Sequence, residues 1–152
     1  MILLKDVIDA GNWFHCEYKR GNQSYQFRLR ILSFQKLDLT QVDEPEKISL
    51  EKETTIWLME AEMINLTKEP ISSGVIGYMD LKNQKGMKYH MSFDSHLLAF
   101  SEFGKMKRLN RFNTQLLIPK IKAVGAIILR LPVNDDNAEY SISIRNGSIC
   151  EV

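Results

Sequence analysis

Candidate metal ligands and catalytic groups are concentrated between Tyr89 and His96. His90, Asp94 and His96 share one parity, so a continued strand would carry them on one face, with roughly 6.6 Å between alternate positions. Imidazole and carboxylate groups are metal ligands, and ligands two residues apart on a strand can reach one ion. A metal site formed by His90, Asp94 and His96 is therefore one hypothesis. The favoured interpretation is the solvated face of a half-buried strand.

Catalysis by this segment is not expected. Ser92 joins the same face, but a nucleophile and its base must approach to about 2.6–3.2 Å, which neighbours along one strand face do not do. The chain contains no G-x-S-x-G motif and no glycine-rich phosphate loop. Glu60 and Glu62 share the polar face of another predicted strand, where paired carboxylates are expected to be solvated. We therefore expect a non-enzymatic protein with no cofactor.

A basic segment is the most plausible contact surface. No acidic residue occurs from Phe103 to Asn134, although the net charge of the whole chain is only +1. The predicted partner-binding residues are Lys105, Lys107, Arg108, Arg111, Lys120 and Lys122. An unknown protein is the expected partner. The alternative is a nucleic acid, with the cations on phosphates and Phe103 or Phe112 stacked on a base; the plainer interpretation is a solvated loop.

Cys16 and Cys150 lie near opposite ends of the chain. We expect two free buried thiols, as is usual inside cells, and a disulfide closing nearly the whole chain is the alternative. Cys16 shares the parity of Phe14 and Tyr18, which predicts a core position. Its neighbour His15 points to the opposite face and cannot activate it directly.

Composition indicates one globular domain spanning residues 1–152. Hydrophobic residues make up 44% and charged residues 26% of the chain, which argues against disorder. No run approaches the roughly 18 apolar residues of a membrane-spanning helix. The N-terminus has no basic start and Lys5 interrupts its apolar run, so we expect a cytoplasmic protein, or an exported one if a leader has been removed.

Alternating apolar and polar residues predict strands along most of the chain. The clearest strand begins at Ile56 and runs into a polar turn that ends at Pro70. Its predicted buried face consists of Trp57, Met59, Ala61 and Met63. The apolar run of residues 2–8 is expected as a short first strand, and residues 94–103 form the only expected helix.

Turn residues connect these strands. Gly21-Asn22 and the segment 82–86 predict two β-hairpins, and Asn146-Gly147 predicts a two-residue turn between strands at 140–144 and 148–152. Eight to ten short strands with at most one helix predict an all-β fold. The expected architecture is an antiparallel two-sheet β-sandwich, with a barrel as the alternative.

The segment Glu62–Ile71 resembles the strand and turn of small bacterial immunoglobulin-like domains, written V-x-N-x-[ST]-x-x-P-I. Asp80 with Gly86 and Pro119 with Gly125 are similar to the turns that follow in that group, which is related to the mycobacterial immunoprotective extracellular antigen. The resemblance covers roughly residues 55–144. It implies an immunoglobulin-like sandwich. Because a sandwich presents its loops on a rigid frame, we expect a binding module whose partner contacts those loops. Members are typically exported, whereas no leader is expected for this chain.

Overall fold

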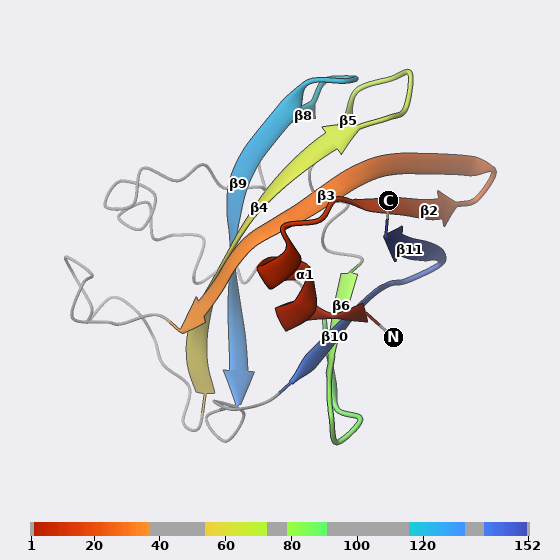
Figure 1. Cartoon of the computed structure of the whole chain (residues 1–152). Coiled ribbons are helices and arrows are strands. Elements are labelled where there is room, and N and C mark those ends of the chain that lie inside the picture. The colour runs from red at the N-terminus through yellow and green to blue at the C-terminus, as the bar shows by residue number, and fades with distance from the viewer. Residues whose placement is uncertain (1, 37–53, 73–78, 91–115, 133–138, 152) are drawn as a thin grey trace.

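The chain folds into eleven strands and one helix within the residues described by a computed structural model, which are 2–36, 54–72, 79–90, 116–132 and 139–151 (Figure 1). In chain order the elements are β1 (Ile2–Leu3), α1 (Leu4–Ala10), β2 (Phe14–Arg20), β3 (Gln23–Lys36), β4 (Thr54–Asn65), β5 (Ile71–Ser72), β6 (Met79–Asn83), β7 (Lys88–His90), β8 (Leu116–Leu117), β9 (Lys122–Pro132), β10 (Tyr140–Ile144) and β11 (Gly147–Glu151).

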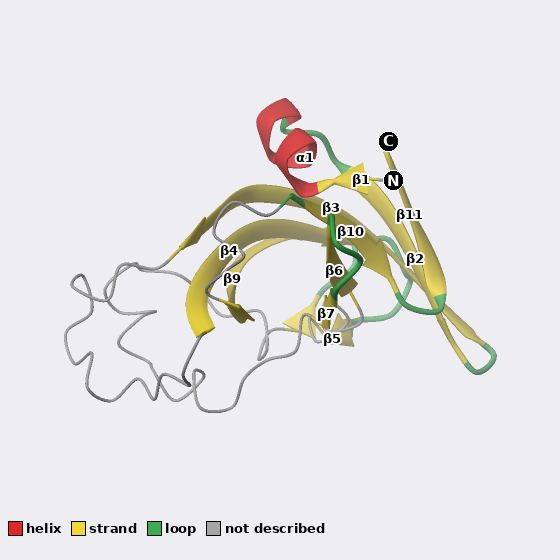
Figure 2. Cartoon of the chain, turned by 90° about the horizontal axis from the view of Figure 1, so that it is seen from below, coloured by secondary structure: helices red, strands yellow, loops and turns green. Residues whose placement is uncertain are grey.

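The strands form two main antiparallel sheets and a small ribbon. One sheet has the order β11-β2-β3-β4-β9, the other has the order β1-β10-β6-β7, and β5 pairs with β8. The long strands β3, β4 and β9 are strongly curved, and β6 and β10 lie on the concave side of that curve (Figure 2). This arrangement confirms the predicted all-β, sandwich-like fold.

The core lies between the inner faces of the two sheets. Phe27 of β3, Met63 of β4, Met79 of β6 and Ile142 of β10 are all almost fully buried and belong to one cluster. The predicted face of β4 is confirmed, because Met59, Ala61 and Met63 are buried, with Trp57 partly buried beside them. Period-two alternation had indicated this face because successive strand residues point to opposite sides.

Both predicted hairpins are present. β2 pairs with β3 across a tight turn in which Gly21 adopts φ +59°, and β6 pairs with β7 across a turn closed by Gly86 at φ +86°. Glycine adopts these left-handed angles at little cost.

The Asn146-Gly147 turn does not join two paired strands. β10, before the turn, pairs with β1 and β6, whereas β11, after it, pairs with β2 in the other sheet. Asn146 does adopt the expected left-handed conformation, at φ +53°. The turn therefore carries the chain from one sheet to the other.

The N-terminal apolar run was predicted wrongly as a strand. After the two-residue strand β1, residues 4–10 form the helix α1, with Leu4 and Val7 buried three positions apart on one face. Gly11 ends the helix at φ +63°, and its N–H donates to the carbonyls of Val7 and Ile8. The predicted helix at 94–103 lies outside the described residues. Within the part that the structure describes, no helix is long and apolar enough to cross a membrane.

A β-bulge in β3 changes which side chains face inward. Ile31 pairs with Ala61 and Phe34 pairs with Met59, so Leu32 is an extra residue in the ladder. Without it, Ser33 would occupy the inward position that Phe34 now takes. The bulge therefore places an aromatic ring beside α1.

Candidate binding sites

Most predicted site residues lie outside the described part of the chain. These are Lys105, Lys107, Arg108 and Arg111 of the basic segment, and Asp94 and His96 of the metal hypothesis. The structure places Lys120, Lys122 and His90. They do not come together, because His90 ends β7 while the two lysines flank the start of β9.

His90 is held by a buried carboxylate. Its Nδ1 hydrogen-bonds to Oδ1 of Asp80, a residue that is 1% exposed, and Arg145 Nε lies 3.3 Å from the same oxygen. This contact fixes the imidazole orientation and directs Nε2 away from Asp80. Among the described residues no group of three or more His, Cys, Asp or Glu side chains could hold a metal ion. The predicted metal site with Asp94 and His96 stays a prediction.

Glu62 is buried, contrary to the expectation of a solvated carboxylate. Arg30 Nε donates to its carboxylate at 2.9 Å, Lys122 Nζ lies 3.5 Å away, and Trp13 stacks over the Arg30 guanidinium at 4.8 Å. Arg30, Glu62 and Lys122 come from the neighbouring strands β3, β4 and β9, and no single strand's sequence reveals this cluster. Lys122 is therefore an ion-paired residue as well as a surface cation.

The connection from β8 to β9 is a tight turn. Ile121 N–H donates to the Ile118 carbonyl at 3.2 Å, Pro119 follows Ile118, and Lys120 adopts φ +65°. A type II turn has proline at its second position and a residue with positive φ at its third. Glycine usually occupies that third position. Lys120 N–H also donates to the Asn65 carbonyl at 2.8 Å, which fixes the turn to the end of β4.

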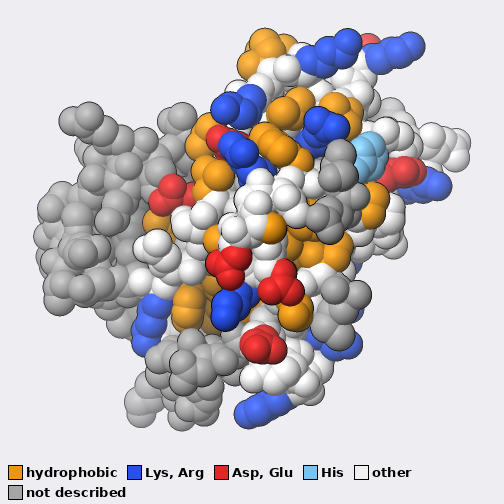
Figure 3. All heavy atoms as spheres, in the orientation of Figure 1, with side chains coloured by type: hydrophobic (Ala, Val, Ile, Leu, Met, Phe, Trp, Pro, Cys, Tyr) orange, Lys and Arg blue, Asp and Glu red, His pale blue; other side chains and the backbone are white. Residues whose placement is uncertain are grey.

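This turn displays an exposed apolar surface that we call the apolar tip. Its members are Leu66, Leu116, Ile118 and Ile121, whose exposed fractions are 38%, 65%, 51% and 58%. Lys68, Lys120 and Lys122 are exposed beside it, with Glu69 as an acidic neighbour. Figure 3 shows hydrophobic side chains interleaved with basic ones at this upper end of the molecule. Single exposed apolar residues are ordinary, but several gathered around one turn are typical of a contact surface.

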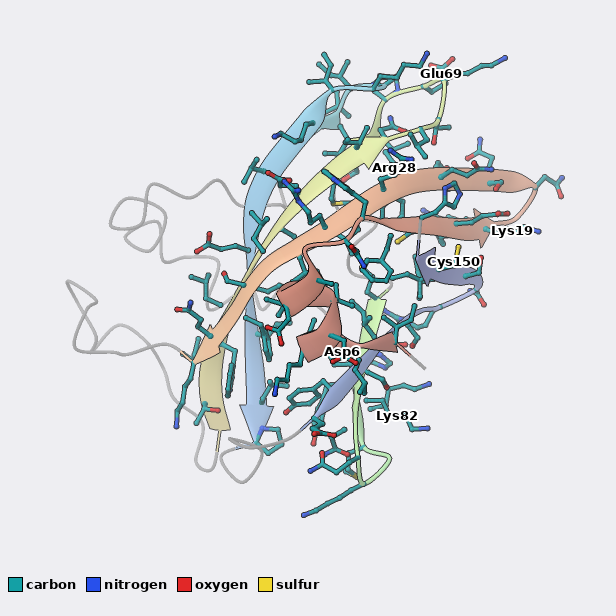
Figure 4. The ribbon with its side chains drawn as sticks, in the orientation of Figure 1. Asp6, Lys19, Arg28, Glu69, Lys82 and Cys150 are labelled. Atoms are coloured by element: carbon teal, nitrogen blue, oxygen red, sulfur yellow. The ribbon has the colours of Figure 1, made fainter. Side chains whose placement is uncertain are left out.

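A second candidate site, the α1 groove, is a cavity of about 580 Å³ between α1, β3, β4 and the start of β10. Its floor is aromatic: Phe34 and Trp57 stack with centroids 4.8 Å apart, and Tyr140 meets Phe34 edge-on at 6.0 Å. Exposed charged side chains surround the opening, namely Lys5, Asp6, Asp9 and Glu139. Asp6 is labelled on α1 in Figure 4.

Sequence reasoning missed both surfaces. The three-residue step from Ile31 to Phe34 departs from alternation and could have indicated the bulge. For the apolar tip, Ile118 and Ile121 around Pro119 form an apolar turn, which is unusual because turns are commonly polar. The groove forms only when α1, β3 and β10 pack together, so no local sequence pattern indicates it.

The two cysteines are free thiols. Cys16 is fully buried on the core face of β2, whereas Cys150 is exposed on β11, so only one of the two matches the expectation of buried thiols. Cys150 pairs in register with His15 and Cys16 with Ile149. The two sulfurs therefore belong to opposite faces of the sheet, which prevents the alternative disulfide.

The buried thiol makes stability depend on pH in alkaline solution. Burial, with a smaller contribution from Cys150, raises the pKa of the Cys16 thiol to about 12. An unfolded cysteine ionises near pH ~8.5, so above that pH the unfolded chain loses a proton that the folded one keeps, and stability falls by up to ~1.4 kcal/mol per pH unit until pH 12. Urea unfolding at pH 8, 9 and 10 should show this slope. The dependence of stability on pH is expected to be shallower in Cys16→Ala, and equal slopes would disprove the role of the thiol.

Together the fold and these surfaces define an antiparallel β-sandwich-like protein with an exposed apolar tip at one end and an aromatic groove beside its helix. The chain matches no protein-family model, and no curated protein is similar enough to match it.

Among solved structures, the chain is similar to a conserved hypothetical protein from Bacillus anthracis, known from a 2.2 Å crystal structure. The two share 16% sequence identity with a TM-score of 0.54, over 91% of this chain and 96% of that one. This likeness supports the fold. The resemblance to immunoglobulin-like domains of the mycobacterial antigen group stays a prediction.

Proposed function

We propose that this protein is a non-enzymatic binding module that contacts a protein partner through the apolar tip. The observation that carries the proposal is the exposure of four large apolar side chains around one anchored turn, with three lysines beside them. Burying one such side chain in an interface contributes ~1.5–3 kcal/mol, and leaving it in water gains nothing. The partner surface that fits has an apolar centre and an acidic rim.

Lys120 supports this use of the turn. A left-handed residue with a side chain costs ~1–2 kcal/mol relative to a right-handed one, and glycine would avoid that cost. Strained positions of this kind cluster at functional sites. A lysine at the centre of the turn sets a cation between Ile118 and Ile121, where it can meet a carboxylate of the partner.

The predicted contact residues of the basic segment 105–111 lie outside the described residues and stay part of the same proposal. Binding of nucleic acid through this segment is the alternative function. It predicts an affinity that falls steeply with salt and depends on the cations more than on the isoleucines.

Replacing Ile118 and Ile121 together by aspartate tests the proposal. A partner is first identified by affinity purification from the native host and then purified. Its dissociation constant, measured by calorimetry, should rise at least ~100-fold, because two buried isoleucines contribute about 3 kcal/mol or more and 1.4 kcal/mol is tenfold.

Met87→Asp is the matched control. Met87 is 56% exposed in the β6–β7 turn, away from the apolar tip, and its replacement should leave the affinity unchanged. Equal binding by the Ile118/Ile121 variant would contradict the proposal. So would a protein that binds only anionic vesicles or oligonucleotides and selects no protein.

A further inference from the structure

The α1 groove is a separate site with its own chemistry, and the argument for it does not rest on the proposed function. Its volume of about 580 Å³ falls within the range of cavities that hold small ligands. It lies beside α1 and the start of β10, whereas the apolar tip lies at the β8–β9 turn.

Three aromatic side chains, Phe34, Trp57 and Tyr140, line the groove. The rings of Phe34 and Trp57 are nearly parallel, at 18°, and the ring of Tyr140 stands at 83° to that of Phe34. Trp57 Nε1 donates to Thr55 Oγ1 at 3.0 Å, so the indole N–H already has an acceptor within the protein. Ring faces carry negative electrostatic potential and attract cations within about 6 Å.

The opening of the groove is acidic. Asp6, Asp9 and Glu139 contribute three carboxylates against the single ammonium group of Lys5. None of the three carboxylates belongs to an ion pair between described residues. The whole chain has net charge +1, so this local acidity does not follow from composition. Acidic side chains also gather over α1 and the start of β10 in Figure 3.

The aromatic floor and the acidic opening of the α1 groove favour the same class of ligand. An acidic opening concentrates cations and repels anions, and an aromatic floor binds both a cation and an apolar body. A neutral apolar ligand would use only the floor, and an inorganic cation would use only the opening. We propose that the α1 groove binds a small organic cation, an alkyl or aryl ammonium ion whose apolar body rests on Phe34 and Trp57.

Trp57 can report binding directly. The chain has two tryptophans, and Trp13→Phe leaves Trp57 as the only one while keeping an aromatic ring beside Arg30. Titrating this variant with benzyltrimethylammonium should change the Trp57 emission saturably. Phenylacetate, an anion of similar size, and benzyl alcohol, a neutral analogue, should bind at least tenfold more weakly.

Two kinds of variant test separately how the acidic opening and the aromatic floor contribute to binding. In the same background, Asp6→Asn, Asp9→Asn and Glu139→Gln together should weaken binding of benzyltrimethylammonium at least tenfold and remove the preference over benzyl alcohol. These side chains are exposed, so the triple variant should keep its fold, as circular dichroism will show. Phe34→Leu should also weaken binding, for both the cation and the neutral analogue.

The control variant is Glu69→Gln, which removes an exposed carboxylate near the apolar tip and should leave cation binding unchanged (Figure 4). Equal affinity for the cation, the anion and the neutral analogue would overturn the proposal. An unchanged affinity in the triple amide variant, or no saturable change at all, would overturn it as well.

Discussion

Replacing Gly147 by alanine is expected to destabilise the protein by about 3 kcal/mol or more, because the new methyl group has no room. A Cβ at Gly147 would lie 1.8 Å from the Glu17 carbonyl oxygen and 2.9 Å from Tyr18 Cα. Both atoms belong to the backbone of β2, the strand that pairs with β11. No side chain can rotate away to relieve the contact, so β11 must shift or separate from the sheet.

Urea unfolding followed by tryptophan fluorescence measures the effect, and Gly21→Ala is the matched control. A Cβ at Gly21 meets nothing within 4 Å, and its φ of +59° imposes only the cost of a left-handed alanine, ~1–2 kcal/mol. If the two variants lose the same stability, the close approach of β11 to β2 is not what requires glycine at position 147.

Asn65→Ala should lower the free energy of unfolding by about 3 kcal/mol, since the side chain satisfies three buried or partly buried backbone groups. Nδ2 donates to the carbonyls of Glu69 and Leu117 at 2.8 and 2.9 Å, and Oδ1 accepts from Thr67 N–H at 2.8 Å. Asn65 itself is fully buried. Alanine would leave these groups without their partner and would also leave a cavity.

Asn65→Asp distinguishes hydrogen bonding from packing. Aspartate keeps the shape and the acceptor but turns an oxygen toward two carbonyls, so it should be at least as destabilising as alanine. The amide of Lys120 donates to the Asn65 carbonyl, so its hydrogen exchange with solvent should also accelerate in both variants. The exposed Asn22→Ala in the β2–β3 turn should change little. A neutral effect of Asn65→Asp would show that its hydrogen bonds do not stabilise the turn.

Local sequence pattern predicted the structure correctly where the contacts that determine that structure are close in sequence. The buried face of β4 followed from alternation, and the two hairpins followed from glycine-containing turns. The turn after Asn65 was also foreseen, because the asparagine side chain binds the backbone two and four residues further on. Its third contact, with Leu117, was not foreseen.

Predictions failed where distant segments decide the outcome. The run at residues 2–8 is apolar enough for a strand or a helix, and packing of Leu4 and Val7 against the core selected the helix. Glu62 is polar by sequence and buried in the fold because Arg30 and Lys122 flank it from β3 and β9. The predicted partner-binding residues were chosen by charge alone, which gave no reason to notice the apolar side chains beside Lys120.

The amino-acid pattern alone was enough to predict antiparallel strands and the inward face of β4, because the two-residue period is a property of each strand. The tertiary structure decided that β10 and β11 enter different sheets, that the Leu32 bulge turns Phe34 inward, and that α1 closes a groove over Trp57 and Tyr140. These features depend on pairing and packing between segments far apart in the chain, whose free energies no local pattern contains.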